Sequence, residues 1–594
     1  MRYLLAFLLV ILLLAPGALA CKDIIALNEA TAGDYHLLLK VRDPSRPGLQ
    51  VLWKVDRGYQ YEYHTPWTGR PVSHTVQHAF LGVATQGDVP PNVFKAGMAL
   101  SDAGIAYGDA DLPSYWINPS PYAWDDFDWI RYACQSAGTE KEAVDLLIEA
   151  VDMHAPGVPE NLFVVGPRTG YVMEATAYHY HLEEVQSLAL RSNYPRELWD
   201  SMVLKNVFVA SSFDRVFEGA VRPGRAVRLG ATMGIRVLAV DDDRVVVRQM
   251  PLGGRVTIPE GEGAMVGFYW VEALDCGGNT ARLRVSYRYH AWEEEMYGRV
   301  AAAAGSITPA DMMAWSRLHS SDLGGMRGMC EAEEKAAMVF KIPRQDYHLF
   351  SMGWFAPDQC AAIFVPVHIV DTDILPAYRN GMAAESARTL LHKFGHGNLT
   401  SDCTRVESVF LHENQAVETV ASGHEAEQVA AILTASDVEM QRQAVLMQNI
   451  FLSAQEAERE MAAGAWNGSY RQTLLAVREA LDEVQSVETR RLLAEVAASI
   501  AGGRLEVASL TGKSVGQNSY REGQKALDQG QYARAVDQFI DTYEDAQRAL
   551  FGRPPSSGIS AGQRRIDLVA AAMGIAVAAL LVLYMARRRA LSGK

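Results

Sequence analysis

Cys21 is the residue in this sequence whose chemistry depends most strongly on its position. It follows an apolar run from Leu4 to Ala15 and the tripeptide Ala18-Leu19-Ala20. A basic start, an apolar core and a small-x-small site are typical of a signal peptide, which is removed from the mature chain. Removal of residues 1–20 would leave a thiol and a free α-amine on Cys21. An α-amine with a pKa of about 7.7–8.0 can act as the general base for its own thiol.

The same position allows a second interpretation. A cysteine directly after a signal core can be the acylation site of a lipoprotein, although such sites usually have a larger aliphatic residue where this chain has Ala18. The two interpretations exclude each other chemically, because acylation of the thiol or of the amine would remove the nucleophile or the base.

The residues after Cys21 predict a β-hairpin that brings charged side chains beside it. Residues 22–27 alternate in polarity, residues 29–34 form a small polar turn, and residues 35–41 read as a second strand. A nearby cation favours the thiolate form of a cysteine. Lys40, Arg42 and Asp43 are the candidates to set this electrostatic environment.

The segment from Cys21 through the turn at residues 30–34 to Lys40-Val41-Arg42-Asp43 resembles the start of the N-terminal nucleophile (Ntn) cysteine hydrolases. It is similar to their linear-amide C-N hydrolases, which include choloylglycine hydrolases, penicillin V acylases, the acyl-coenzyme A:6-aminopenicillanate acyltransferases and the C69 dipeptidases. The resemblance implies catalytic roles for Cys21, Lys40 and Asp43. The family more often has Arg where this chain has Lys40, so either Lys40 or Arg42 supplies the positive charge, and Arg42 is also a candidate substrate-binding residue.

Further motifs follow in the family's order. Ser192-Asn193-Tyr194-Pro195 resembles the motif whose Asn helps to bind the oxyanion, where one donor lowers the barrier by ~3 kcal/mol. Residues 210–215 resemble the Ser-rich segment that ends in the site Arg, which implies a catalytic role for Arg215. Asp111 falls where many members have a second oxyanion Asn, so it is a candidate substrate-binding residue, although a carboxylate binds an anion poorly unless it is protonated.

A later stretch, Ser351 to Val367, resembles the late core segment of the C69 dipeptidases, in which a Trp strand leads into a Val-Pro strand. The resemblance therefore extends over residues 21–378. It implies an α+β fold, a four-layer αββα Ntn-hydrolase sandwich in which helices such as 141–151 and 309–318 cover two antiparallel sheets.

The rest of the chain predicts helices followed by a membrane anchor. Helical spacing of apolar residues predicts an α-helical stalk domain over residues 379–550, and residues 551–567 have the composition of a linker. Residues 568–586 are apolar and uncharged, which is close to the ~20 residues needed to cross a bilayer. The sequence thus predicts one C-terminal transmembrane helix, a cytosolic tail at 587–594 and a single-pass protein of the cell membrane with an extracytoplasmic catalytic domain.

Composition limits the partners of the chain. With 594 residues, of which 49% are hydrophobic and 21% charged, it can bury more than one core, and its net charge of −15 argues against nucleic acid. We expect no cofactor, and the six cysteines show no zinc-ligand spacing. His392 and His396 have the i, i+4 spacing of paired metal ligands, but Gly395 and Gly397 disfavour a stable helix, so we expect no metal there.

The predicted function is hydrolysis of linear amide (C-N) bonds, in small peptides or N-acyl amides, through a thioester on Cys21. An acyltransferase would form the same intermediate and would differ in excluding water. The alternative from another class is a non-catalytic binding protein, anchored by a lipid or in the membrane, that has kept the fold.

Overall fold

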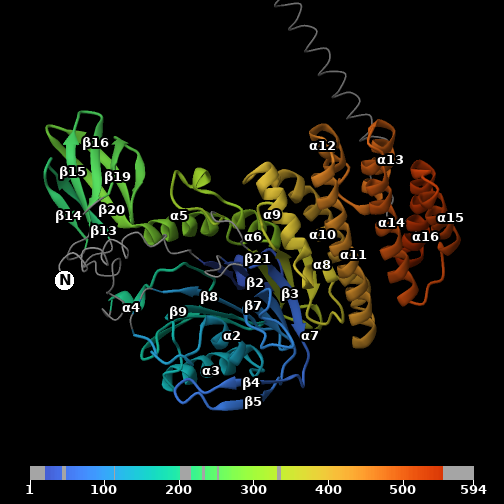
Figure 1. Cartoon of the computed structure of the whole chain (residues 1–594), viewed down its shortest axis with the longest axis horizontal. Helices are drawn as coiled ribbons and strands as arrows, with labels where there is room; N and C mark the ends of the chain where they lie inside the picture. The colour runs from blue at the N-terminus through green and yellow to red at the C-terminus, as the bar shows by residue number, and fades with distance from the viewer. Residues whose placement is uncertain are drawn as a thin grey trace, which may run out of the picture.

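The structure is a computed structural model that describes residues 21–42, 48–112, 114, 116–200, 216–229, 234–250, 253–330 and 336–552. These residues form a mixed α/β part, a smaller β unit and a helical region (Figure 1). The α/β part contains Cys21 and is built around two large antiparallel sheets.

The first sheet contains the strand that begins next to Cys21. Its first hairpin joins two strands that are buried almost throughout, which suits a sheet covered on both faces. In order across the sheet, the strands are β12 (Leu188–Arg191), β1 (Lys22–Ala26), β2 (Tyr35–Arg42), β21 (Ala336–Pro343), β22 (Met352–Ala356) and β23 (Val365–His368).

The second sheet has seven strands and is formed from the next part of the chain. Between the first two strands of this sheet in the sequence, the chain forms a separate hairpin of β4 (Gln60–His64) and β5 (Pro71–Thr75). Across the sheet the order is β11 (Tyr180–Val185), β10 (Gly170–Ala175), β9 (Glu160–Val165), β8 (Ala106–Asp111), β7 (Ala96–Ser101), β6 (Phe80–Thr85) and β3 (Gln50–Val55).

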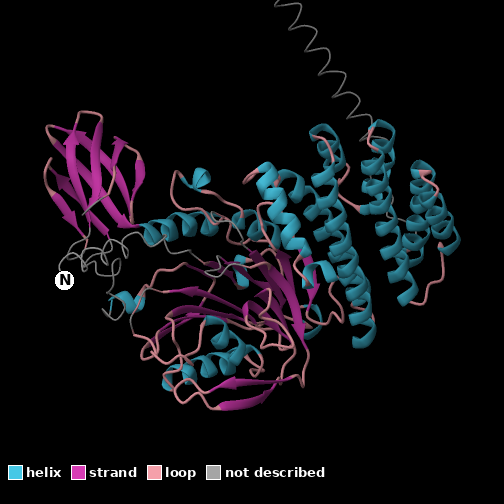
Figure 2. Ribbon diagram, in the orientation of Figure 1, coloured by secondary structure: helices cyan, strands magenta, loops and turns pink. Residues whose placement is uncertain are grey.

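The inner faces of the two sheets meet where β1 and β2 cross β8 and β9. Helices α2 (Asp126–Cys134) and α3 (Glu140–Asp152) pack on the second sheet, whereas α5 (Arg288–Ala302) and α6 (Pro309–Ser316) pack on the first (Figure 2). Reciprocal capping boxes begin α2 and α6 and pair the orphan N–H groups of their first turns. Two single-turn helices, α4 (Glu197–Asp200) and α7 (Tyr347–Phe350), lie in the connections.

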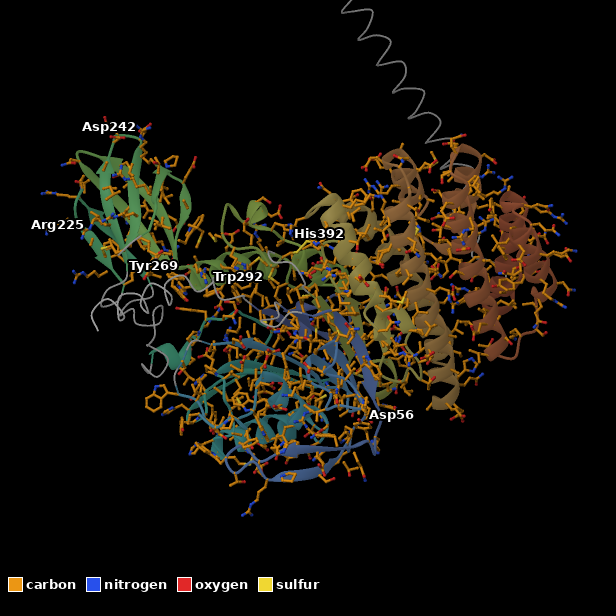
Figure 3. All side chains as sticks on the ribbon, viewed as in Figure 1. Asp56, Arg225, Asp242, Tyr269, Trp292 and His392 are labelled. Atoms are coloured by element: carbon orange, nitrogen blue, oxygen red, sulfur yellow. A yellow bond between two sulfur atoms is a disulfide. The ribbon has the colours of Figure 1, made fainter. Side chains whose placement is uncertain are left out.

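A separate β unit lies between β12 and β21 in the sequence and has its own core of valine, isoleucine and leucine side chains. Figure 3 shows Tyr269 near the end of this unit that adjoins α5, the helix that carries Trp292. One sheet contains β13 (Val216–Val221), β20 (Thr280–Tyr287), β19 (Tyr269–Gly277) and β18 (Gly263–Val266), and the other β14 (Ala226–Arg228), β15 (Gly234–Val240), β16 (Arg244–Met250) and β17 (Arg255–Pro259).

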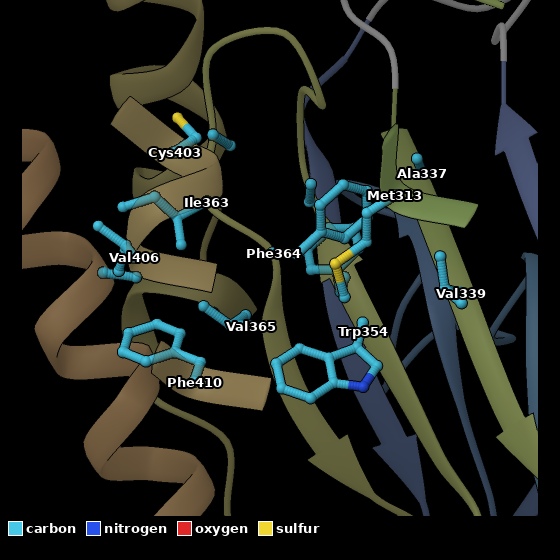
Figure 4. Close-up of a cluster of buried hydrophobic side chains, with 14 of the residues drawn as sticks. Met313, Ala337, Val339, Trp354, Ile363, Phe364, Val365, Cys403, Val406 and Phe410 are labelled. Atoms are coloured by element: carbon cyan, nitrogen blue, oxygen red, sulfur yellow. The ribbon is translucent and has the colours of Figure 1, made fainter. Parts of the chain in front are cut away.

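The helical region packs against the first sheet near β22 and β23. Trp354 of β22 and the neighbouring Phe364 share one apolar core with Phe410 of α10 (Figure 4). The helices are α8 (Pro376–Arg379), α9 (Met382–Phe394), α10 (Thr400–Ala421), α11 (Ala426–Ser453), α12 (Glu456–Gly464), α13 (Tyr470–Glu483), α14 (Val487–Leu510), α15 (Gln517–Asp528) and α16 (Tyr532–Phe551).

A buried ionic cluster fastens β23 to two of these helices. His368 Nδ1 lies 2.7 Å from an Asp437 oxygen on α11, and its Nε2 lies 3.3 Å from Glu418 on α10. Burial by itself lowers the pKa of His368, but the Asp437 carboxylate and the hydrogen bonds to Asp437 and Glu418 raise that pKa to about 10. The nearby Asp371 also accepts from the His368 backbone N–H, and burial raises the pKa of its carboxyl group well above its usual value.

This cluster predicts a loss of stability at alkaline pH. The pKa of His368 rises on folding from about 6.5, the usual value for an exposed histidine, to about 10. The stabilisation is therefore complete below pH 6.5 and falls by up to about 1.4 kcal/mol per pH unit as the pH rises towards 10. Guanidinium unfolding between pH 6 and 10 measures this slope. The slope should flatten in His368→Gln and persist in His412→Gln, which changes an exposed histidine on α10; equal slopes in both variants would contradict the assignment.

The prediction of a four-layer sandwich that ends in a transmembrane helix is wrong in its membrane part. No helix in the residues that the structure describes is long and apolar enough to cross a membrane. The segment 568–586, on which that prediction fell, and the signal segment 1–20 lie outside the described residues. The structure contains a mixed α/β fold with an added β unit and a helical C-terminal region. The predicted single-pass membrane localisation therefore has no support in the described residues.

Candidate active site

The register of the first sheet places Cys21 in one row with two of the sequence-predicted site residues. In the antiparallel β1–β2 pair, Asp23 lies opposite Lys40, so extending the register by two residues brings Cys21 opposite Arg42. In the β1–β12 pair, Asp23 lies opposite the last residue of β12, and the same extension brings Cys21 opposite Asn193. The nucleophile candidate, which is only 8% exposed, is therefore flanked by the backbone positions of Arg42 and Asn193.

A buried ionic cluster lies two residues further along the same strand face. Lys40 Nζ is 3.6 Å from Asp23 Oδ2 and 3.2 Å from Asp109 Oδ1, and it donates to the Asp109 carbonyl oxygen. The side chains of Lys40 and Asp23 are fully buried, and that of Asp109 is nearly so. The cluster joins β1 and β2 of the first sheet to β8 of the second.

The charges of this cluster are coupled to one another and to the thiol. Burial by itself lowers the pKa of Lys40, but Asp109, Asp23 and Cys21 outweigh burial and raise that pKa well above its usual value. Burial raises the pKa of Asp23 well above its usual value, with Lys40 opposing the rise and Asp109 adding to it. Lys40 therefore stays charged beside Cys21, and Asp23 favours its protonated form.

Gly108 on β8 makes room for this cluster. A Cβ atom at Gly108 would lie 2.4 Å from Asp23 Oδ1 and 3.7 Å from Lys40 Cδ. The first of these distances is a clash, so a side chain at this position would push the carboxylate away from the lysine. The close approach of the two sheets at Asp23 thus depends on glycine here.

Asn193 is held in place from both sides of the chain. Its Nδ2 donates to the Asp111 carbonyl oxygen at 2.6 Å, at the end of β8. The carboxamide of Asn161 on β9 donates to the carbonyl oxygens of Ser192 and Tyr194, the two neighbours of Asn193. An Asn amide nitrogen carries two hydrogens, and the bond to Asp111 uses one of them. The second is a hydrogen-bond donor on the residue opposite Cys21.

Glu293 of α5 fixes the same segment from the outer face of the sheet. Its Oε1 accepts from the Ser192 N–H at 2.8 Å and from the Ser192 hydroxyl at 3.0 Å, and its Oε2 lies 3.0 Å from Arg196 Nε. The carboxylate is buried and bridges the residues on either side of Asn193. Helix α5 therefore positions the carboxamide without touching it.

The two cations considered from the sequence have different surroundings. Lys40 lies between two carboxylates, as described above. Arg42 donates to Gln50 Oε1 at 2.6 Å and to Thr85 Oγ1 at 3.3 Å, and its charge also opposes the rise that burial causes in the pKa of Asp111 and of Asp126. The Arg42 guanidinium also stacks over the Phe127 ring, 4.6 Å from its centroid. Arg42 lies opposite Cys21 in the register, and Lys40 interacts electrostatically with Cys21, so both cations are placed to favour a thiolate.

Asp111 belongs to a group of acidic side chains at the end of β8. It lies opposite Glu160 in the β8–β9 pair, and one oxygen each of Asp109, Asp111 and Asp126 lies within 4.8 Å of the others. Burial, and then the Asp111 carboxylate, raise the pKa of Glu160 well above its usual value, and burial likewise raises the pKa of Asp111. These shifts favour the protonated acids, the state in which Asp111 could donate to an anion.

Two of the candidates, Asp43 and Arg215, lie outside the described residues. Sequence reasoning missed four residues that shape the site, namely Asp23, Asp109, Asn161 and Glu293. A usable signal existed for two of them, because Asp23 and Asp109 are acidic residues next to apolar residues in predicted strand segments. Such residues are rarely buried unless they are paired.

No protein-family model and no curated protein matches this sequence. Among solved structures, a mutant conjugated bile acid hydrolase from Clostridium perfringens is similar over 58% of this chain and 92% of that chain, with 11% identity and a TM-score of 0.30. The penicillin V acylase from Agrobacterium tumefaciens is similar over 40% of this chain and 86% of that chain, with 13% identity and a TM-score of 0.23. These structural neighbours are amide hydrolases, and at such TM-scores the likeness alone assigns no activity to this chain.

Proposed function

We propose that this protein hydrolyses linear amide bonds, with Cys21 as an N-terminal nucleophile after removal of residues 1–20. The observation that carries the proposal is the row in which Cys21 lies between Arg42 and Asn193 in the register of the first sheet. A thiol, a cation and an oriented amide donor are the groups that acyl transfer to cysteine requires. The sequence resemblance to the Ntn cysteine hydrolases supports the same assignment.

The first half of the reaction forms a thioester. The α-amine of Cys21 takes the proton of its own thiol, directly or through a water molecule, and the thiolate attacks the substrate carbonyl carbon. The electron pair of the C=O bond moves to oxygen, and the free Nδ2 hydrogen of Asn193 stabilises this oxyanion. When the intermediate collapses, the C-N bond breaks and the leaving amine takes the proton from the Cys21 ammonium group.

The second half releases the acid. The Cys21 amine, again neutral, accepts a proton from water while the water oxygen attacks the thioester carbon. The tetrahedral intermediate then expels the Cys21 sulfur, which regains its proton. An acyltransferase would pass the same acyl group to an amine in place of water, and competition between water and added amines for the acyl group distinguishes the two activities.

The substrate class that we propose is a small peptide or an N-acyl amide. This choice rests on the resemblance of the motifs around Cys21 and Ser351–Val367 to the linear-amide hydrolases. A panel of dipeptides, N-acyl amino acids and penicillins, assayed for release of a free amine, ranks these substrates.

The decisive test of the nucleophile is to locate a covalent acyl adduct. We expect an electrophilic lactam or amide probe to add one acyl group per chain, on the peptide that begins with Cys21. Intact mass of the same sample shows whether residues 1–20 have been removed. Cys276→Ala is the matched control, because Cys276 in the β unit is 6% exposed, close to the 8% of Cys21. Labelling that persists in Cys21→Ala, or a chain that keeps residues 1–20 and still turns over, would refute the proposal.

Loss of the Asn193 donor should slow acylation selectively. Asn193→Ala removes the hydrogen bond to the oxyanion, and loss of one such donor typically costs about 10²–10³ in rate. We therefore expect the probe to acylate Cys21 about 10²–10³ times more slowly in this variant. Alkylation of Cys21 by iodoacetamide forms no oxyanion, so its rate should change little. If both reactions slow equally, Asn193 acts on the thiol or the fold and not on the oxyanion. Asn92→Ala, at an exposed asparagine, serves as the control.

A further inference from the structure

Two cysteines and two histidines from four separate segments converge away from Cys21. They are His319, which follows α6, Cys330 in the next loop, Cys360 after β22, and His396 just beyond α9. One ligand atom from each residue lies within 4.8 Å of the other three. Three of the residues belong to the α/β part and the fourth to the helical region.

The side chains point at one another in a specific way. His319 Nε2 lies 3.0 Å from Cys360 Sγ, and the rings of His319 and His396 have centroids 5.6 Å apart at an interplanar angle of 69°. Cys330 and Cys360 are buried, whereas His396 is exposed. The cluster thus has a dry, sulfur-lined side and an imidazole at the surface, which gives an ion a path of entry.

The structure joins Cys330 and Cys360 by a disulfide. Their Cα atoms are 7.1 Å apart, beyond the usual disulfide range of about 4.4–6.8 Å. A disulfide by itself also gives no reason for two imidazoles to gather at its sulfur atoms. Two thiolates and two imidazoles, in contrast, are a set of four ligands that binds Zn²⁺ tetrahedrally.

We propose that the dithiol form of Cys330 and Cys360 binds one Zn²⁺ together with His319 and His396. Tetrahedral Zn²⁺ bonds of about 2.0–2.3 Å require ligand atoms about 3.3–3.8 Å apart, so side-chain shifts of about 1 Å complete the site. Each thiol loses its proton as its sulfur bonds to zinc. The disulfide form must first take up two electrons and two protons from a thiol reductant.

A carboxylate lies near one of the proposed ligands. Asp322 Oδ2 lies 3.8 Å from His319 Nδ1 and accepts from the His319 backbone N–H at 2.8 Å. His319 Nε2 is directed at Cys360, and a shift of the Asp322 carboxylate by about 1 Å would let it accept from Nδ1, as carboxylates do for metal-bound histidines. With four protein ligands the site is closed to substrate, so the zinc fastens the end of α9 to the loop after β22 and takes no part in the chemistry at Cys21.

The experiment uses the full chain, reduced with dithiothreitol, loaded with Zn²⁺ and freed of unbound metal. We expect one zinc per chain by elemental analysis, and Co²⁺ in its place should give thiolate charge-transfer absorption with the visible bands of a tetrahedral site. Cys330→Ser and Cys360→Ser should lose both signals. Asp322→Asn should keep the site but weaken zinc affinity about 10-fold.

His392→Gln is the matched control for His396→Gln, because His392 is an exposed histidine on the last turn of α9 (Figure 3). Zinc affinity should fall in His396→Gln and remain unchanged in His392→Gln. Circular dichroism of each variant checks that it is folded. The proposal is overturned if the reduced wild-type chain takes up no zinc, or if a folded Cys330→Ser or Cys360→Ser chain takes it up as the wild type does.

Discussion

Cys21→Ala is expected to abolish amide hydrolysis, with a fall in kcat on the order of 10⁶-fold, the loss seen when a covalent nucleophile is removed. The reason is that the substitution removes the only atom that forms the thioester, while Asn193 and Arg42 remain to bind the carbonyl group. Substrate binding should therefore survive. Release of a free amine from the best substrate of the panel measures turnover, and calorimetric titration of the inactive variant measures binding.

A second variant separates the thiol from the amine of the same residue. A chain that keeps one residue in front of Cys21 retains the thiol but has no α-amine on it, so it loses the general base. Such a loss typically costs about 10²–10⁴ in rate, which is less than the loss of the thiol. If the chain with the extra residue turns over as fast as the chain that begins at Cys21, another group is the general base. If Cys21→Ala turns over at that same rate, Cys21 takes no part in the mechanism.

The position of Arg42 opposite Cys21 could be predicted from the sequence, because it depends on the pattern of residues within one hairpin. The β-rich residues 22–27, the polar turn and the second strand predict a hairpin, and the structure has β1 at Lys22–Ala26 and β2 at Tyr35–Arg42. Antiparallel pairing then brings the end of β2 beside Cys21. Asn193 could be anticipated only from its motif, because no short-range pattern pairs residues some 170 positions apart.

The side chains that contact the residues around Cys21 come from distant parts of the chain, so they depend on tertiary packing and could not be predicted. Asp109 meets Lys40 only because β8 of the second sheet crosses β2, and Glu293 reaches Ser192 from a helix that follows the β unit. That β unit interrupts the segment which the sequence treats as one domain. The candidate zinc ligands have no recognisable spacing for the same reason, since each of the four comes from a different segment.

Lys40→Met is expected to destabilise the chain by about 3–5 kcal/mol, the usual cost of removing one partner from a buried ion pair. Methionine keeps the length and apolar stem of lysine, so the effect comes from the charge. Without Lys40, the acidic side chains of Asp23 and Asp109 remain buried between the sheets with no cation from this position, so ionising either of them becomes more costly. Guanidinium unfolding followed by tryptophan fluorescence measures the free energy of unfolding.

The pH dependence distinguishes this explanation from a loss of packing. Removing the lysine raises the folded-state pKa of Asp23 further above its unfolded value, so the variant should lose stability as the pH rises and recover part of it at pH 5. Adding Asp109→Asn to Lys40→Met removes one of the uncompensated charges and should restore stability at pH 8. Lys141→Met, at an exposed ion pair with Asp145, should cost no more than about 0.5 kcal/mol. If the loss of unfolding free energy does not depend on pH, and if Asp109→Asn does not relieve it, Lys40 stabilises the fold by packing alone. In that case its charge does not stabilise the buried acidic side chains beside Cys21.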